Sequence, residues 1–405
     1  MYRPASPDLA TQATLDHPDG LLQLIPGLRL RRADSSGPVS QRRLGLNFAR
    51  QDYLGLAGAP SVRSAALAAL GPHDLADSGS MPCHEMTGQV CMLEARIGAF
   101  LRLPVAVTFP SGQEAIRQTL RTLLRPGDHI IVDSAAHPAM FETVLISQAQ
   151  LHRSPAGSVD GVERRLSRLA RQPRRGRLVI AVPAVSAHGS AIADLAELSA
   201  LARLHDAILI ADVTHDLGAM GQSGGGVMEI QACLSRVDIV LGSFAKSFGA
   251  SGGFAAVRDP DLASAMDSSQ WSTAALSPVN AAVILAALDV VTSPEGRRRR
   301  RNLHGIALRL RNHLMADGLR PMGRASPFVP ILLPMSTAQA RTALLESAGP
   351  LVTLLQAPRV PLHAPRWRFQ LNADHSPADI DDLAELIRDV SRAFDRRPAR
   401  MRVSV

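Results

Sequence analysis

Lys246 is the only lysine in this chain of 405 residues, because the other 43 of its 44 basic residues are arginines. Arginine stays protonated and is a poor nucleophile, whereas a lysine amine taken out of water can lose its proton and attack a carbonyl. Lys246 lies in the run Gly242-Ser-Phe-Ala-Lys-Ser-Phe-Gly-Ala-Ser-Gly-Gly253, where its neighbours are small or apolar. This setting favours a lysine that forms a Schiff base over a solvated surface lysine.

Polar residues follow each of the short apolar runs 106–109, 130–133, 178–182, 208–212 and 237–241. The carboxyl ends of parallel strands meet at one edge of a sheet, where ligands bind, and free amides at a helix start bind phosphate. Taken singly, a residue of this kind belongs to a turn or supports the fold more often than it binds a ligand. Together they offer an anion cradle, an imidazole, a hydroxyl, a carboxylate and an amine, the set that pyridoxal 5'-phosphate (PLP) requires. The residues are Ser111, Gly112, Gln113, His137, Ser186, Asp212, His215, Ser243 and Lys246.

The elements that must position these residues alternate between strand and helix. The five apolar runs suit strands buried on both faces of a sheet, and 113–124 and 192–204 have helical spacing. This alternation predicts an α/β fold with a mostly parallel sheet. Beyond a linking helix at 278–291, helices at 303–314, 337–348 and 378–393 and strands at 328–333 and 367–371 predict a smaller α+β domain. We predict an N-terminal arm (1–55) with one helix near 21–30, a large domain (56–290) and a small domain (291–405).

Several motifs carry a resemblance to a known family, over about residues 45–390. They are Asp52-Tyr-Leu-Gly-Leu56, Phe109-Pro-Ser-Gly112, Asp133-Ser-Ala-Ala-His137, Ala211-Asp-Val-Thr-His-Asp-Leu-Gly-Ala-Met-Gly221, Gly242-Ser-Phe-Ala-Lys246 with Gly252-Gly253, and Arg366-Trp-Arg-Phe-Gln-Leu-Asn-Ala-Asp-His375. With these, the chain resembles the α-oxoamine synthases, which are fold-type-I PLP enzymes. The resemblance implies a mostly parallel seven-stranded sheet with helices on both faces and a small C-terminal domain.

The implied reaction is a decarboxylative Claisen-type condensation. A small α-amino acid such as glycine, alanine or serine would react with an acyl thioester, carried by CoA or an acyl carrier protein, to give an α-amino ketone and CO2. Another PLP reaction on the same fold, such as that of an aminotransferase or a retro-aldol lyase, remains an alternative. A non-enzymatic regulator or nucleic-acid binder is a third hypothesis, which an intact Lys246 and Asp212 oppose.

The resemblance also implies a role for each candidate residue. Lys246 would hold PLP and move the substrate α-proton, and Asp212 would pair with the ring nitrogen. His215 and Ser186 would bond the ring oxygen, and His137 would stack on the ring. Four residues would surround the phosphate, namely Ser111, Gly112, Gln113 and Ser243.

On the substrate side, Arg368 would take the amino-acid carboxylate in a two-point fork, with Arg359 as a helper. Ser272 and Thr273 match a segment that reaches the neighbouring subunit's phosphate in this family, which implies a homodimer.

The chain departs from the family pattern in three places. Asp212-Val-Thr-His215 stands where Asp-Glu-Ala-His is usual, and Ala187-His188-Gly189 stands where Met-Asp-Gly is common. The glycine-containing segment 79–88 is followed by a shortened stretch that leads to Glu94. The resemblance places this segment near the substrate, which implies an unusual acyl or amino-acid preference.

Composition narrows the class of protein. The chain is 46% hydrophobic and 20% charged, as expected of a globular enzyme. Three cysteines have no metal-binding spacing, and the longest apolar stretch, 281–291, is too short to span a bilayer. With no signal peptide at its start, the protein is predicted to be cytoplasmic. Despite a net charge of +8, only 3% of residues are aromatic and no nucleic-acid-binding motif is present, so we expect no nucleic-acid partner.

Overall fold

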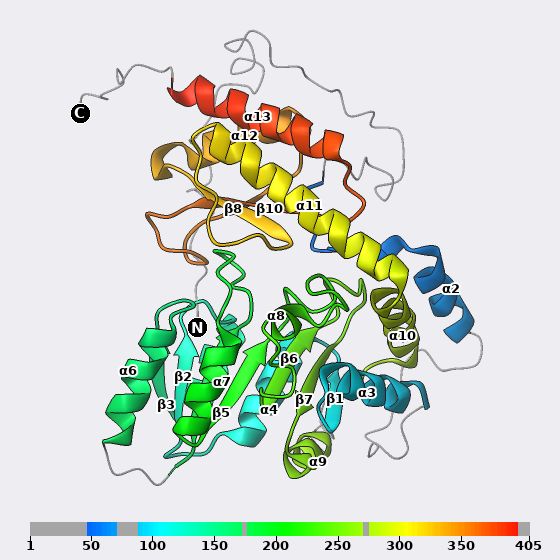
Figure 1. The fold of residues 1–405 in the computed structure, drawn as a ribbon, viewed down its shortest axis with the longest axis vertical. Helices are drawn as coiled ribbons and strands as arrows, with labels where there is room; N and C mark the ends of the chain where they lie inside the picture. Colours follow the sequence, from blue (N-terminus) through cyan, green and yellow to red (C-terminus); the bar gives the residue numbers. More distant parts are fainter. Residues whose placement is uncertain (1–46, 71–87, 172–175, 270–274, 396–405) are drawn as a thin grey trace, which may run out of the picture.

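The computed structural model describes residues 47–70, 88–171, 176–269 and 275–395. Figure 1 shows two units, a large one built on a sheet with helices on either side and a smaller one stacked beyond the carboxyl ends of its strands. The predicted helix near 21–30, the segment 79–87, and Ser272 and Thr273 lie outside the described residues.

The large domain is built on a seven-stranded sheet with the order β1-β7-β6-β5-β4-β2-β3. All neighbouring pairs from β6 to β3 are parallel, and β7 is antiparallel to both β6 and β1. The mostly parallel seven-stranded sheet is therefore confirmed. The strands are β1 (Val105–Phe109), β2 (His129–Asp133), β3 (Gln150–Ser154), β4 (Leu178–Pro183), β5 (Ala207–Asp212), β6 (Ile239–Ser243) and β7 (Gly253–Val257).

Helices cover both faces of this sheet, as predicted. The central strands β2, β4 and β7 are buried along their whole length, which explains their continuous apolar sequences. One face packs against α4 (Gly112–Leu123), α5 (Pro138–Ser147) and α9 (Pro260–Ser269). The other packs against α3 (Gly88–Leu101), α6 (Val159–Ala170) and α7 (Leu195–Leu204), and the short helix α8 (Gly226–Ile230) contacts α7.

Two helices that meet at Ser293 join the two units. They are α10 (Pro278–Thr292), which packs on α2 (Pro60–Ala69), and α11 (Pro294–Ala316). Among the described residues no single helix is long and apolar enough to cross a membrane. Only α10 and α11 taken together have that length and composition, and they bend by 75° at their break.

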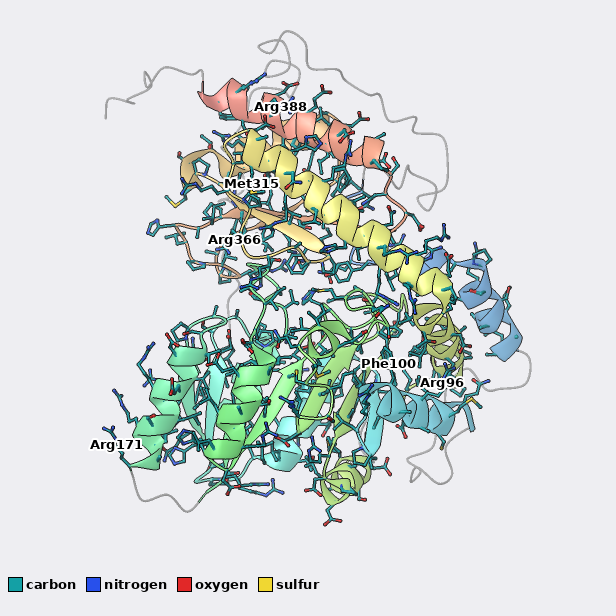
Figure 2. The ribbon with its side chains drawn as sticks, in the orientation of Figure 1. Arg96, Phe100, Arg171, Met315, Arg366 and Arg388 are labelled. Atoms are coloured by element: carbon teal, nitrogen blue, oxygen red, sulfur yellow. The ribbon has the colours of Figure 1, made fainter. Side chains whose placement is uncertain are left out.

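The small domain contains an antiparallel sheet in the order β8-β10-β9, formed by β8 (Phe328–Leu332), β10 (Arg366–Gln370) and β9 (Thr353–Leu355). The helices α12 (Ala338–Ser347) and α13 (Pro377–Asp395) pack with α11 around it. Strand β10 alternates, with Trp367 and Phe369 in the core and Arg366, Arg368 and Gln370 at the other positions. Figure 2 shows Arg366 on the side of the small domain that faces the large domain.

The segment that leads into the large domain runs along the small sheet. The amide of Phe48 donates to the carbonyl of Leu351 and its carbonyl accepts from the amide of Gln370, both at 2.8 Å. The carbonyl of Tyr53 accepts from the amide of Ala373 at 2.8 Å. Residues 48–53 therefore lie between the two domains. The predicted domain boundaries at 55/56 and 290/291 remain predictions.

Some elements differ from the sequence expectation. Helix α11 begins at Pro294 rather than at 303, because Ser293 caps it and the arginine run that follows is helical without an apolar stripe. Within that run Arg299 donates to the carbonyl of Leu54, and the buried Arg300 donates to the carbonyl of Val291. Strand β6 begins at Ile239 rather than at 237.

Candidate active site

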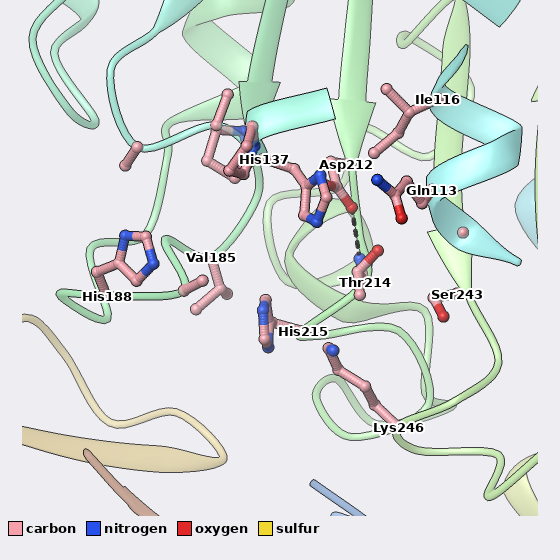
Figure 3. A pocket seen from close by; sticks show the side chains of 16 residues that line it. Gln113, Ile116, His137, Val185, His188, Asp212, Thr214, His215, Ser243 and Lys246 are labelled. Carbon is pink, nitrogen blue, oxygen red and sulfur yellow. Dashed lines mark hydrogen bonds between the residues drawn. The ribbon is translucent and has the colours of Figure 1, made fainter. Parts of the chain in front are cut away.

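A cavity of about 150 Å³ opens at the carboxyl edge of the large sheet (Figure 3). It lies where β2, β4, β5 and β6 end and where α4 and α5 begin. Most of the predicted cofactor residues line it together, namely Gly112, Gln113, His137, Asp212, His215, Ser243 and Lys246. Ser111 and Ser186 flank lining residues in the sequence, but they are not lining residues themselves.

The start of α4 supplies an anion cradle at one end of the cavity. Ser111 caps the helix by accepting the amide of Glu114 at 3.1 Å, which leaves the amides of Gly112 and Gln113 free of this cap. A Cβ on Gly112 would lie 2.6 Å from the Cβ of Ser243, so the backbone comes this close only as glycine. Free amides, the helix dipole and the Ser243 hydroxyl suit a phosphate.

Asp212 is the last residue of β5 and is 8% exposed. One carboxylate oxygen accepts the amide of Thr214 at 3.0 Å, which orients the group at the cavity wall (dashed line in Figure 3). The carboxylate also lies close enough to raise the pKa of Lys246. A fixed anion in this position can hold a protonated ring nitrogen.

Lys246 follows β6 and points toward the cavity from the side opposite His137 in Figure 3. Burial lowers the pKa of its amine to about 8, against the opposing effect of Asp212, and the Arg368 cation lowers it further. Its Nζ donates to Oε1 of Gln51 at 2.6 Å. At neutral pH a usable fraction of this amine is uncharged and nucleophilic.

Two imidazoles, His137 and His215, face the same cavity. Burial lowers the pKa of His137, and burial lowers the pKa of His215 well below its ordinary value, aided by the cation of Lys246. The Nδ1 atom of His137 caps α5 by accepting the amide of Ala139 at 3.1 Å. Since an acceptor nitrogen bears no proton, neutral His137 carries its proton on Nε2.

Arg368 is the substrate-side candidate and reaches the site from β10 of the small domain. Its Nη1 donates to the carbonyl of Ala187 at 2.9 Å, and its guanidinium lies 5.7 Å from the ring centre of Phe328. Its Nε is buried and has no hydrogen-bond partner among the described residues. Burial lowers the pKa of Arg368, and Tyr53 raises it. The positive charge of the exposed Arg359 lowers it further.

Four site residues were not among the sequence candidates. Gln51 contacts the Lys246 amine, Tyr53 bonds to His215, and Thr214 and His188 line the cavity. Burial lowers the pKa of His188, and Arg368, Arg366 and Arg359 lower it further. The motif Asp52-Tyr-Leu-Gly-Leu56 includes Tyr53, and the unusual Ala187-His188-Gly189 includes His188, whereas Gln51 lies outside the motifs.

The residues fit PLP by their own chemistry. A phosphate-sized cradle, a buried carboxylate and an amine of depressed pKa surround one cavity, as PLP requires. When bound, PLP supplies a carbonyl that captures amines and a ring that withdraws electrons from the substrate α-carbon. The fold and the site together define a fold-type-I PLP-dependent enzyme.

Comparison with known proteins agrees with this class. The family model described as aminotransferase class I and II matches residues 45–387. The chain is 32% identical to 8-amino-7-oxononanoate synthase of Citrifermentans bemidjiense, over 92% of this chain and 94% of that one, and 32% identical to the synthase of the same name from Marinobacter nauticus, over 87% and 90%. Sphingomonas wittichii serine palmitoyltransferase superposes with a TM-score of 0.81 at 25% identity, covering 87% and 88%. The chain belongs to the aminotransferase class I and II family and, within it, to the PLP-dependent α-oxoamine synthases.

Proposed function

We propose that this enzyme condenses a small α-amino acid with an acyl thioester, carried by CoA or an acyl carrier protein. The products are an α-amino ketone, CO2 and the free thiol. The observation that carries the proposal is Lys246, the single lysine, whose pKa is lowered to about 8 by burial in a cavity that it shares with Asp212. Glycine, alanine and serine are the candidate amino acids, in keeping with the family.

On the cofactor side, each residue has a separate task. Lys246 would hold the cofactor and then remove the α-proton of the amino acid. Asp212 would hold the proton on the ring nitrogen, and His215, with Ser186, would donate to the ring oxygen. His137 would stack on the ring, and Gly112, Gln113 and Ser243 would hold the phosphate, with Ser111 fixing the start of α4.

On the substrate side, Arg368 binds the α-carboxylate. Its buried Nε is available for a second hydrogen bond, as a two-point fork requires. Arg359 adds positive charge near the same place, and His188 borders the cavity on this side. These groups favour an anionic substrate.

A turnover assay tests the reaction. The PLP-loaded enzyme is mixed with glycine, alanine or serine and an acyl thioester, and both thiol and CO2 are measured. We expect release of both with at least one amino acid, and loss of about 10³-fold or more in Lys246→Ala. Lys246→Arg should not restore the rate, because guanidinium is not a usable nucleophile.

Two outcomes of the assay contradict the proposal. Normal turnover by Lys246→Ala removes Lys246 from the reaction. A requirement for a keto acid, without thioester cleavage or CO2 release, indicates an aminotransferase instead.

We also propose that the enzyme is a cytoplasmic homodimer in which Ser272 and Thr273 reach the partner's phosphate site. Support comes from the family resemblance of the segment that contains them, which lies outside the described residues. Sedimentation of the PLP-loaded protein at about twice the 43.2 kDa chain mass is the expected result. A monomer with full activity contradicts it.

A further inference from the structure

Tyr53 lies against His215 although the two residues are 162 positions apart in the chain. Its phenol oxygen is 2.8 Å from Nδ1 of His215, and the tyrosine is fully buried. Tyr53 comes from the segment between the two domains, whereas His215 comes from the loop that follows β5. The contact therefore joins two parts of the chain at the cavity wall.

The direction of this hydrogen bond follows from the surroundings. Burial raises the pKa of Tyr53, against the lowering effect of Arg368, so its hydroxyl keeps its proton. Among the hydrogen bonds of the described residues, Nδ1 of His215 is the one partner of this hydroxyl. A buried O–H group that does not donate is costly, and the nearby Arg368 cation favours turning the oxygen lone pairs toward itself. Tyr53 is accordingly the donor and Nδ1 is the acceptor.

The protonation state of His215 completes the argument. Burial lowers its pKa well below the ordinary value, and the cations of Lys246 and Arg368 lower it further. The ring is therefore neutral and has one N–H group. With Nδ1 accepting from Tyr53, that proton is on Nε2.

Packing holds the two rings in register. Phe328 of β8 meets His215 edge to face with centroids 5.4 Å apart, and it stacks on Tyr53 at 6.4 Å. His137 reaches the same tautomer by another route, since its Nδ1 accepts a backbone amide. His137 and His215, two of the three imidazoles that line the cavity, thus both present an Nε2–H group.

We propose that Tyr53 is a positioning residue that fixes His215 as an Nε2–H donor to the ring oxygen of the cofactor. This inference rests on the proposed function for the identity of the acceptor, but the tautomer itself is a property of the protein alone. A donor at that oxygen favours its ionised form and lowers its pKa.

Nitrogen-15 NMR of the histidines in the cofactor-free protein tests the tautomer, with His215→Gln used to assign the signals. We expect an Nε2–H ring in the wild type and a shift toward the Nδ1–H form in Tyr53→Phe. Phe328→Leu is the matched control, because it loosens the packing and keeps the hydroxyl. An Nδ1–H ring in the wild type, an unchanged Tyr53→Phe spectrum, or an equal change in Phe328→Leu overturns the proposal.

A second readout uses the PLP-loaded enzyme. The pH midpoint of its visible absorbance should rise by roughly one unit in Tyr53→Phe, the effect of one lost hydrogen bond to a charged oxygen. An unmoved midpoint contradicts the assigned donor role. If the protein binds no PLP, the proposed function fails, and the wild-type NMR spectrum still decides the tautomer, even where Tyr53→Phe does not fold.

Discussion

Burial and a nearby anion act on the pKa of Lys246 in opposite directions. Burial disfavours the ammonium form, whereas the Asp212 carboxylate favours it, and the balance places the pKa at about 8. Below that value the folded protein protonates the amine, and above it the amine is free to react. An exposed lysine would reach the same state only near a pH of about 10.4.

The rate at which cofactor-free protein captures PLP should therefore rise with pH through about 8 and then level off. Stopped-flow absorbance across pH 6.5–10 gives this midpoint. In Asp212→Asn the midpoint should fall, because the anion that favours the ammonium is gone. A wild-type rate that still climbs near pH 10 would show an ordinary, solvated lysine.

At the same scale, the sequence predicted those site residues that follow an apolar strand directly. Asp212, His137 and Ser243 follow apolar strands, and that position alone predicts the carboxyl edge of a parallel sheet. Gln51 and Tyr53 have no such signal. They reach the site because residues 48–53 pair with the small sheet, which is a contact between segments far apart in the sequence.

At the scale of elements, the phosphate cradle depends on how closely α4 approaches β6 and β7. A Cβ on Gly253 would lie 2.4 Å from the amide nitrogen of Gly112, which is backbone and cannot rotate away. Gly253→Ala should push the start of α4 off the sheet and weaken PLP binding by about tenfold or more. Equilibrium titration of PLP absorbance measures the change.

Gly305→Ala is the matched control for this substitution. Gly305 lies inside α11, and a Cβ there meets no atom within 4 Å. Alanine should leave PLP affinity unchanged and stabilise the helix by about 0.5–1 kcal/mol. Equal PLP affinity in Gly253→Ala and wild type would remove this glycine contact from the cradle.

The elements that were predicted have a continuous apolar run or a repeated apolar spacing, although the amphipathic helix α6 was not predicted. The buried strands β2, β4 and β5 and the helix α4 stand within one or two residues of the expected bounds. Strand β3 was missed because it is a polar sheet edge, Gln-Leu-His-Arg-Ser. Strand β7 was missed because its run Gly-Phe-Ala-Ala-Val begins in a glycine-rich loop. Tertiary pairing, rather than local preference, makes both of them strands.

At the scale of the whole molecule, the residues that line the cavity belong to the large domain, and the small domain supports this wall through hydrogen bonds. Arg366 and Arg368 of the small domain donate to the carbonyls of His188 and Ala187 in the large one. Beneath the site, the loop between β5 and α8 is tied down by Arg300, which donates to the carbonyl of Gln222 at 2.7 Å. Polar groups buried between packed parts make global stability sensitive to pH.

Asp216, in that same loop, gives the clearest case. It is fully buried, one carboxyl oxygen accepts the amide of Val227 at 2.7 Å, and the other has no partner among the described residues. Burial raises its pKa to about 8 from an ordinary value of 3.8. Between these values the folded state binds more protons than the unfolded state, so this group's contribution to the free energy of unfolding falls as pH rises toward 8.

Asp216→Asn should remove that loss, because the amide is neutral at every pH and can still accept from Val227. The variant should have its smallest advantage in stability at pH 5, because the unfolded-state pKa of the aspartate is 3.8 and the loss begins there. The advantage should grow on the way to pH 8 and level off above it, with a further gain on the order of 4 kcal/mol between pH 5 and 9. Thermal unfolding of the cofactor-free proteins at pH 5, 7 and 9 measures it. A difference that stays constant across this range would mean that Asp216 is already ionised in the folded protein at pH 5, and that the loop stabilises the carboxylate rather than the acid.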